Sequence, residues 1–357
     1  MEIHQIVPSL CNNDAVGNYV IEIRKLLLNQ GYVSNIYAKY SDPEVSKYSK
    51  ELFKYKGNSR NIILYHMAIG GGDVTYFVKN LPDRKILIYH NITPAVFFSQ
   101  YNQELQHLCY QGLEEINEIK DTFHLAITVS EYNEMCLKEL GYLKTAVVPI
   151  LMDINPSIID QKIEISTEKY SKCTINIIFV GRISPHKKIE DIILAFYYYN
   201  FYINPDSRLF LIGKIQFPTY YYNLCELIKK LQITNAVVFT GEVTEEEKRR
   251  YYEISHIFLC MSEHEGFCVP LLEAMQFKIP VIAYNSTAIP GTLGDAGILI
   301  NKKNYVVIAE IINILINDCA VRNRIIQKQN ERVKFFDKEV VGRQIIEKIE
   351  SLVNDYD

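Results

Sequence analysis

The sequence predicts an α/β protein built from two doubly wound, parallel-sheet domains of the Rossmann type. Short apolar segments alternate with helix-length connections along most of the chain, which is the pattern of βαβ units. The alternation stops at a polar stretch between Leu151 and Cys173, which we interpret as a linker, and then begins again. A length of 357 residues is also about that of two domains. We therefore expect an N-terminal domain over 1–160, a C-terminal domain over 161–337, and a last helix over 338–357 that packs back on the first domain. The two sheets should face each other across a cleft.

The first half of the chain holds apolar segments of strand length, each followed by a polar loop. We expect strands over Glu2–Val7, Asn61–Tyr65, Lys85–Tyr89, Leu125–Val129 and Thr145–Pro149. Between them the pattern predicts a helix that ends near Gln30 before Gly31, a long helix over about 98–118, and a helix that ends near Leu140.

The second half repeats this architecture without repeating the sequence. We expect strands over Ile175–Val180, Arg208–Ile212, Ala236–Thr240, Ile257–Met261, Val281–Tyr284 and Gly297–Ile300. A capping box, Thr244 with Glu247 three residues later, predicts the start of one helix between these strands. The end of the chain, about 309–353, is predicted to be helical throughout.

Composition excludes several classes of protein. A hydrophobic content of 48% with 22% charged residues is that of an ordinary globular protein, and a net charge of −4 argues against a dedicated nucleic-acid binder. The eight cysteines form no C-x-x-C pair, which fits small core residues in a reducing compartment. The first residues resemble no signal peptide, and no apolar run approaches the roughly 18–20 residues that span a bilayer. We expect a cytoplasmic protein, either free or in peripheral contact with the inner face of the membrane.

The most informative stretch is Ser262–Pro280, SEHEGFCVPLLEAMQFKIP. It follows an apolar strand, turns polar at once, and continues as an amphipathic helix whose first turn suits Pro270. Open α/β sheets bind their ligands at such carboxyl ends of strands. Glu265 and Glu273 are therefore candidates to bind a polar ligand.

A second candidate loop follows the strand over Ile175–Val180. Gly181 allows a tight turn, and Arg182 and Lys187 place two cations near a helix N-terminus, which suits a diphosphate. Taken alone, this could equally be a surface loop with two solvated charges. Gly213 and the segment 239–243 also end strands, and each alone is an ordinary strand exit.

Together these segments resemble the C-terminal domain of glycosyltransferase family 4, a retaining family with the GT-B fold. The matching segments, in family order, are FVGRISPHKK, LIG, FTGEV, SEHEGFCVPLLEAM and IPVIAYNSTAIP with GDAGILI after it. In the first half, DAVGN and YHNITP resemble the family's glycine loop and the histidine that ends an N-domain strand.

The resemblance implies a role for each matching residue. Arg182 and Lys187 would hold the donor's pyrophosphate, Glu265 would lie beside the transferred sugar, and His90 would approach the sugar from the first domain; these four are the expected catalytic residues. The expected substrate-binding residues are Gly17, Asn18, Gly181, Gly213, Val243, Gly266, Phe267, Cys268, Val269 and Glu273, the last on the ribose hydroxyls.

The resemblance also implies the reaction. We expect a retaining, metal-independent hexosyltransferase that uses a nucleotide-sugar, UDP- or GDP-linked, and no further cofactor. Its acceptor would be a glycan or a lipid-linked glycan in cell-surface polysaccharide assembly. Two alternatives stay open at this point, a nucleotide-sugar epimerase on the same fold and a non-catalytic subunit of transferase origin.

Several other signals have a plain structural interpretation. His256, Cys260, His264 and Cys268 recur every four residues, but a strand and Gly266 break the series, so we expect no metal site. We expect the aromatic run 196–202 to be helix packing rather than a membrane or acceptor contact, and the cations of 248–250 to be solvated. The glycine run 70–73 is equally a turn or a substrate contact, and His66 is expected to be structural. Gly291 stands where many family members have Glu, and Cys268 where they often have Gly.

Overall fold

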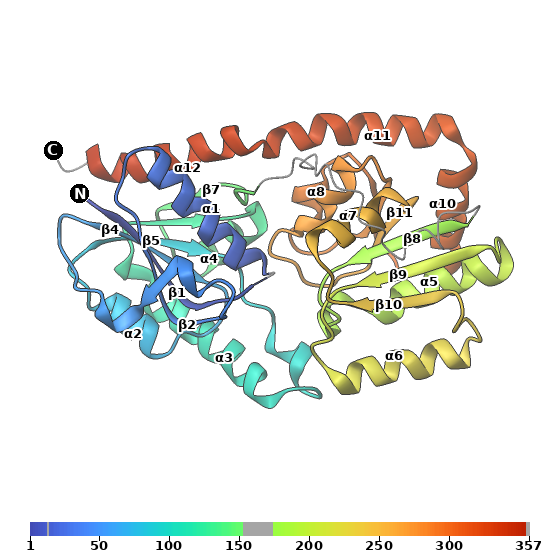
Figure 1. The fold of residues 1–357 in the computed structure, drawn as a ribbon, viewed down its shortest axis with the longest axis horizontal. Helices are drawn as coiled ribbons and strands as arrows, with labels where there is room; N and C mark the ends of the chain where they lie inside the picture. Colours follow the sequence, from blue (N-terminus) through green and yellow to red (C-terminus); the bar gives the residue numbers. More distant parts are fainter. Residues whose placement is uncertain (13, 153–173, 355–357) are drawn as a thin grey trace. The chain divides into compact units, whose positions relative to one another are not determined.

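The computed structural model describes residues 1–12, 14–152 and 174–354 (Figure 1). The chain divides into two compact units: unit 1 is Met1–Ser99 with Gln103–Asp153 and Phe335–Asp357, and unit 2 is Gln100–Asn102 with Ile154–Lys334. The expected linker and the boundary at 160 fall in 153–173, outside the described residues.

Unit 1 is built on a seven-stranded sheet in the order β3-β2-β1-β4-β5-β6-β7, and every pairing is parallel. Its strands are β1 (Ile3–Leu10), β2 (Ile36–Ser41), β3 (Ser49–Glu51), β4 (Ile62–Met67), β5 (Arg84–Tyr89), β6 (Leu125–Thr128) and β7 (Thr145–Val147). Its α-helices are α1 (Ala15–Asn29), α2 (Asp73–Lys79), α3 (Gln103–Glu118), α4 (Glu131–Glu139) and α12 (Lys338–Asn354). Strand β4 is buried along its whole length, as expected for a parallel sheet with both faces covered.

Unit 2 is built on a six-stranded sheet in the order β10-β9-β8-β11-β12-β13, again with parallel pairings throughout. Its strands are β8 (Ile175–Val180), β9 (Ser207–Ile212), β10 (Val237–Gly241), β11 (Ile257–Cys260), β12 (Val281–Tyr284) and β13 (Ile298–Ile300). Its α-helices are α5 (Ile189–Tyr202), α6 (Pro218–Lys230), α7 (Glu245–Glu253), α8 (Val269–Gln276), α9 (Ile289–Leu293), α10 (Tyr305–Asn317) and α11 (Cys319–Val333). The predicted fold class, two Rossmann-like parallel-sheet domains, is confirmed.

Three details differ from the sequence predictions. Strands β2 and β3 were not predicted, because only the first half of β2 is buried and β3 is a three-residue edge strand. The long helix begins at Gln103, after a separate 3₁₀ turn over Ala95–Phe98. The end of the chain, predicted to be helical throughout, is divided into α10, α11 and α12; the Asp318 carboxylate accepts the backbone N–H groups of Ala320 and Val321 and starts α11.

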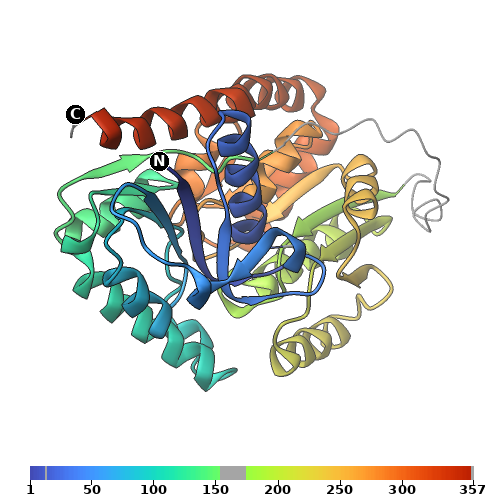
Figure 2. The same cartoon turned by 60° about the vertical axis from the view of Figure 1, so that its left-hand side comes forward.

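Helix α12 lies beside α1 in both views of the ribbon (Figures 1 and 2). The Lys338 ammonium is 2.7 Å from the Glu22 carboxylate, and the Tyr32 hydroxyl donates to Glu350 at 3.0 Å. Gly342 packs against the Leu26 side chain. The last helix is thus an integral part of unit 1.

Each sheet reverses its strand order once, between β1 and β4 in unit 1 and between β8 and β11 in unit 2. Loops that leave the carboxyl ends of such neighbouring strands diverge, and ligands of doubly wound folds bind between them. In unit 2 these two loops are 181–188 and 261–268, the two candidate loops of the sequence.

Candidate active site

The reversal in unit 2 brings two of the predicted catalytic residues into contact. Lys187 ends a 3₁₀ turn after β8, and its ammonium donates to the Glu265 carboxylate, in the loop after β11, at 2.6 Å. Both side chains are largely buried, 14% and 9% exposed. A buried pair of this kind holds two charges in fixed positions, and removal of one partner leaves the other unpaired.

Glycines bring the backbone of neighbouring loops together at the same edge of the sheet. Gly213 follows β9 with a φ of +141°, and a Cβ atom there would lie 2.2 Å from the Gly181 carbonyl oxygen. Only glycine fits at this position. Arg182, the next residue after Gly181, is exposed and has no ion-pair or hydrogen-bond partner among the described side chains. It is available for an anion from solvent.

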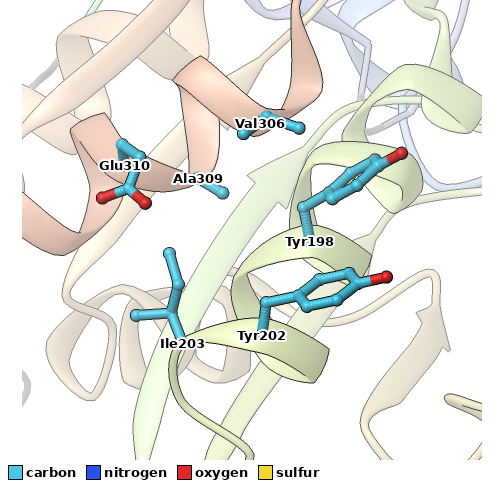
Figure 3. Close-up of a pocket in the computed structure, with 6 residues that line it drawn as sticks. All are labelled: Tyr198, Tyr202, Ile203, Val306, Ala309 and Glu310. Atoms are coloured by element: carbon cyan, nitrogen blue, oxygen red, sulfur yellow. The ribbon is translucent and has the colours of Figure 1, made fainter.

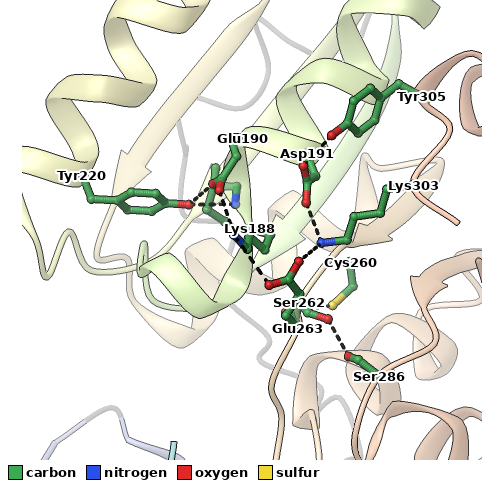
Figure 4. A network of polar contacts seen from close by, with 11 residues as sticks. Lys188, Glu190, Asp191, Tyr220, Cys260, Ser262, Glu263, Ser286, Lys303 and Tyr305 are labelled. Atoms are coloured by element: carbon green, nitrogen blue, oxygen red, sulfur yellow. Dashed lines mark hydrogen bonds and ion pairs between the residues drawn. The ribbon is translucent and has the colours of Figure 1, made fainter. Parts of the chain in front are cut away.

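The loop that carries Glu265 is held at several points by polar contacts (Figure 4). Glu263 accepts from the Lys303 ammonium at 2.7 Å, and Lys303 also donates to Asp191 in the first turn of α5 at 2.6 Å. The Ser286 hydroxyl donates to the Ser262 carbonyl at 2.6 Å. The loop is therefore preorganised against α5 and the region after β12.

The backbone of Glu265 has two further contacts. Its N–H donates to the Thr287 hydroxyl at 2.9 Å, and its carbonyl oxygen accepts the Ala288 N–H at 3.4 Å. The neighbouring His264 is buried. Burial lowers the pKa of His264 to about 4, despite the opposing effect of the Glu265 carboxylate. The imidazole is neutral at pH 7, so Lys187 is the cation that faces Glu265.

The loop ends at the N-terminus of α8, as predicted from Pro270. Cys268 is the N-cap residue with a left-handed φ of 72°. A glycine would adopt this conformation at lower cost. The backbone N–H groups of Gly266, Cys268 and Val269 donate to no protein acceptor among the described residues. Phe267 is buried, and its carbonyl accepts from the Thr292 hydroxyl at 2.5 Å. Three amides at a helix N-terminus suit an anionic or hydroxylated ligand.

Glu273 lies one turn into α8, and both of its oxygens are occupied by side chains of α7. The Lys248 ammonium donates to one oxygen and the Tyr252 hydroxyl to the other, each at 2.8 Å. Burial and the Glu273 carboxylate raise the pKa of Tyr252 well above its usual value, so the phenol donates. The prediction of solvated cations over 248–250 is wrong for Lys248, which is only 20% exposed.

Sequence reasoning missed Lys248 and Tyr252, although a signal was present. They are four residues apart, a spacing that places two side chains on one face of a helix. The structure confirms the predicted capping box of Thr244 and Glu247 at the start of α7. Val243, predicted to contact the base, is half-buried between β10 and this capping box.

Two cysteines at this corner lie beside Glu265. The thiols of Cys260 and Cys268 and a Glu265 carboxylate oxygen are within 4.8 Å of one another, and all three residues are buried. The hydrogen bond between the thiols lowers the pKa of Cys260 and raises that of Cys268. The structure thus brings together two members of the four-residue His and Cys series. His256 instead accepts the backbone N–H of Asn176.

In unit 1, His90 follows β5 and is buried beside His66 of β4. His66 Nδ1 is 3.1 Å from His90 Nε2, and His66 Nε2 is 3.0 Å from the Gln5 side-chain oxygen. Gly17 is buried in the first turn of α1, where a Cβ atom would lie 2.3 Å from the Cys11 carbonyl oxygen. Asn18 is exposed on the same helix. Gly17 therefore allows α1 to approach the loop after β1.

The glycine run 70–73 is a turn held by the protein itself. The Glu115 carboxylate accepts the backbone N–H groups of Gly71 and Gly72, each at 2.8 Å, and the Thr75 hydroxyl at 2.6 Å. These amides already have an anionic partner, so of the two interpretations the structure supports the turn.

The aromatic run 196–202 is partly core and partly surface. Phe196 and Tyr199 are buried, as predicted for helix packing. Tyr198 and Tyr202 instead line an apolar pocket of about 230 Å³ together with Val306 and Ala309 of α10 (Figure 3). The one charged residue at this pocket is Glu310. An anionic ligand would find no cation in its lining.

Solved structures show which class of fold this is. The chain is similar to Anabaena HepE, solved in complex with UDP-glucose, with a TM-score of 0.77 and 16% identity over 98% of this chain and 100% of that one. Sucrose-phosphate synthase from Thermosynechococcus elongatus has a TM-score of 0.77 and 17% identity over 99% and 100% of the two chains. The fold is GT-B.

The sequence comparison then narrows the class. Residues 161–332 match the family described as glycosyl transferases group 1. Together the match and the fold confirm the predicted resemblance to glycosyltransferases of the GT-B fold. The matched residues include Arg182, Lys187, Glu265 and Glu273.

Curated relatives with a described activity share more of the sequence than these structures do. The serotype-specific mannosyltransferase WbdA of Escherichia coli is 23% identical over 246 residues, which cover 67% of this chain and 30% of WbdA. The O-antigen chain mannosyltransferase B of Escherichia coli is 22% identical over 255 residues, 68% of this chain and 64% of the relative. The chain thus matches only part of the length of either relative. No helix among the described residues is long and apolar enough to cross a membrane.

Proposed function

We propose that this protein is a retaining glycosyltransferase that moves a hexose from a nucleotide-sugar to a glycan or lipid-linked acceptor. The single observation that carries this proposal is the Lys187–Glu265 pair, 2.6 Å apart and next to three backbone amides with no protein acceptor in the described part of the chain. A cation, a carboxylate and free amides at one strand end form a site for a group that carries both phosphate and sugar hydroxyls.

The chemistry follows from the charges. When the sugar–phosphate bond breaks, negative charge accumulates on the departing diphosphate and positive charge on the anomeric carbon. Arg182 and the Lys187 ammonium would stabilise the diphosphate, and one such contact is worth roughly 3–4 kcal/mol. The chain supplies these two cations itself, so we propose that no metal ion is required.

Glu265 is proposed to position Lys187 and the sugar rather than to act as a nucleophile. Its carboxylate already accepts from Lys187, and its backbone is held by Thr287. Glu273 is proposed to bind the ribose hydroxyls, and it would exchange one of its bonds to Lys248 or Tyr252 for them.

The setting is proposed from the relatives. Two of them are named as mannosyltransferases, one of these for the O-antigen chain, and Anabaena HepE was solved with UDP-glucose. We infer a role in cell-surface polysaccharide assembly with a UDP- or GDP-linked hexose.

The test is a thermal-shift screen of the purified protein against nucleoside diphosphates and their sugars. A true donor at about 100 times its Kd should add about 2.7 kcal/mol of stability. The hit is then incubated with acceptor glycans, and the anomeric configuration of the product is determined by NMR. Inversion would contradict the retaining mechanism.

Two controls separate the alternatives. Conversion of the donor with no acceptor present would indicate an epimerase. Stabilisation by the nucleoside diphosphate with no turnover of any nucleotide-sugar would indicate a binding subunit. If no nucleotide or nucleotide-sugar stabilises the protein and none is turned over, the proposal is overturned.

A further inference from the structure

A buried chain of three side chains in unit 1 fixes where the protons lie on two histidines. The chain runs from Gln5 of β1 to His66 of β4 and on to His90 after β5. Gln5 is fully buried and His66 is 1% exposed. Each link is a hydrogen bond of ordinary length, 3.0 Å and 3.1 Å.

The orientation of the Gln5 amide comes first. Its nitrogen donates to the Val20 carbonyl oxygen at 3.0 Å, and a carbonyl oxygen can only accept. The other end of the amide, which faces His66, is therefore the oxygen. Since this oxygen carries no hydrogen, His66 Nε2 must be the donor, 3.0 Å away.

The protons on the two imidazoles then follow in sequence. Burial lowers the pKa of His66 well below its usual value and that of His90 to about 3, so each ring is neutral and carries one N–H. With its proton on Nε2, His66 has a lone pair on Nδ1. His90 Nε2 lies 3.1 Å from His66 Nδ1, so the single N–H of the His90 ring must be on Nε2, where it donates to that lone pair.

One nitrogen remains at the end of this chain. His90 Nδ1 is a lone pair with no hydrogen-bond donor among the described residues. His90 keeps 9% of its surface exposed, so the residue is not fully sealed from solvent. Tyr19 packs edge-on against both imidazoles, with ring centroids 5.6 Å and 6.0 Å away, and limits their rotation.

We propose that Gln5 and His66 are positioning residues that hold His90 in its Nε2–H tautomer, so that His90 presents Nδ1 only as an acceptor for a hydroxyl of the bound sugar. The sugar part of this inference rests on the proposed function. A site that hydrogen-bonds a hydroxyl discriminates strongly against the analogue that lacks it, because the acceptor is then left unpaired. The hydrogen-bonded series of Gln5, His66 and His90, which we call the relay, would therefore contribute to sugar selection.

The first test needs no ligand. Long-range ¹H–¹⁵N correlation spectra of the uniformly ¹⁵N-labelled protein at pH 7 distinguish the two tautomers of each histidine. His90 and His66 are assigned from the signals lost in His90→Asn and His66→Asn. We expect protonated Nε2 and unprotonated Nδ1 on both rings. A protonated Nδ1 on His90, or an average of the two tautomers, would overturn the proposal.

The second test asks whether the relay acts on the reaction. His66→Leu removes the acceptor for His90 Nε2–H, whereas His66→Asn keeps an amide oxygen near the position of Nδ1. We expect His66→Leu to lose the tautomer preference of His90 and at least tenfold in kcat/KM, and His66→Asn to recover most of both. Equal activity of the two variants and the wild type would show that the relay is only structural, and would overturn the proposal. If His66→Leu does not fold, the wild-type spectrum decides.

Failure of this inference and failure of the proposed function give different results. The wrong tautomer in a protein that turns over a nucleotide-sugar overturns the inference alone. The expected tautomer in a protein that turns over none overturns the proposed function, and the sugar as the partner of Nδ1 with it.

Discussion

The two sheets reverse strand order in the same way, yet the side chains at the two reversals differ in charge. In unit 2 the reversal holds the largely buried ion pair of Lys187 with Glu265, and a second pair, Lys248 with Glu273, joins α7 to the helix that follows the loop. In unit 1 it holds the neutral chain of Gln5, His66 and His90. One topology thus supports two kinds of site. The charged corner, with Lys187 and Glu265, suits a diphosphate, and the neutral corner, with Gln5, His66 and His90, suits hydroxyl groups. The difference lies in the side chains and not in the fold.

The largest expected effect is at the charged corner. Lys187→Ala should lower turnover of the donor by about 10²–10³-fold, because the diphosphate loses a positioned cation and Glu265 is left as an unpaired buried charge. The measurement is kcat/KM with the donor found in the thermal-shift screen. Lys328→Ala, which removes an exposed ion pair with Asp295, is the matched control and should retain full activity. If both variants are fully active, the charged corner is not the donor site.

The next effect is the sensitivity of the neutral corner to acid. The pKa values of His66 and His90 are lowered in the folded state, so the unfolded state binds protons first as the pH falls below about 6.5. Stability is therefore complete above that pH and decreases as the pH falls toward the folded pKa. Each of the two histidines should lower the free energy of unfolding by about 1.4 kcal/mol for every pH unit below about 6.5.

Urea unfolding of the wild type and His90→Gln at pH 7.5 and 5.5 measures this effect. The variant should lose about 1.4 kcal/mol less than the wild type between the two pH values. The exposed His107 supplies a control, since His107→Gln should behave like the wild type. An equal loss in wild type and His90→Gln would mean that His90 is not buried as a neutral ring.

A smaller effect is expected at Glu273, which is paired with Lys248 and also accepts a hydrogen bond from the neutral Tyr252 hydroxyl. Tyr252→Phe removes one hydrogen bond to Glu273 but leaves Lys248 in place, and should cost about 1 kcal/mol in the free energy of unfolding. If Glu273 binds ribose, the variant should keep nucleoside-diphosphate affinity within a fewfold, whereas Glu273→Gln should lose about tenfold. Isothermal titration calorimetry measures both, and unchanged affinity in Glu273→Gln would exclude the ribose role.

The smallest effect is expected at Gly291, where many family members have Glu. A Cβ atom at this residue would have no described atom within 4 Å, and Gly291 is exposed. Gly291→Glu should change stability by less than about 0.5 kcal/mol, as measured by the urea midpoint. A larger loss would show that the glycine is required for the backbone. A changed sugar preference at unchanged stability would place this residue at the sugar.

The sequence predicted the strands of unit 2 almost to the residue, because each is a short apolar run followed by a glycine or a polar loop. It failed at β2 and β3, which are half-exposed or very short and lack that contrast. Of the candidate site, motif spacing predicted Lys187, Glu265 and Glu273. It could not find that Lys187 and Glu265 form a pair, since 78 residues separate them and only the strand order brings β8 beside β11. The Gln5–His66–His90 chain was equally hidden, because its members come from β1, β4 and the loop after β5, and Gln5 belongs to no motif.

The pairing of α12 with α1 has a consequence for synthesis of the chain. Unit 2 is complete at Lys334, whereas unit 1 lacks α12 until residues 338–354 are made. Domains tend to fold as units during translation, from the N-terminus onward. Here unit 1 cannot complete its folding until unit 2 has been synthesised, and the apolar flank of α1 stays uncovered until α12 packs on it. The nascent N-terminal half therefore exposes this flank of α1 for as long as unit 2 is being synthesised.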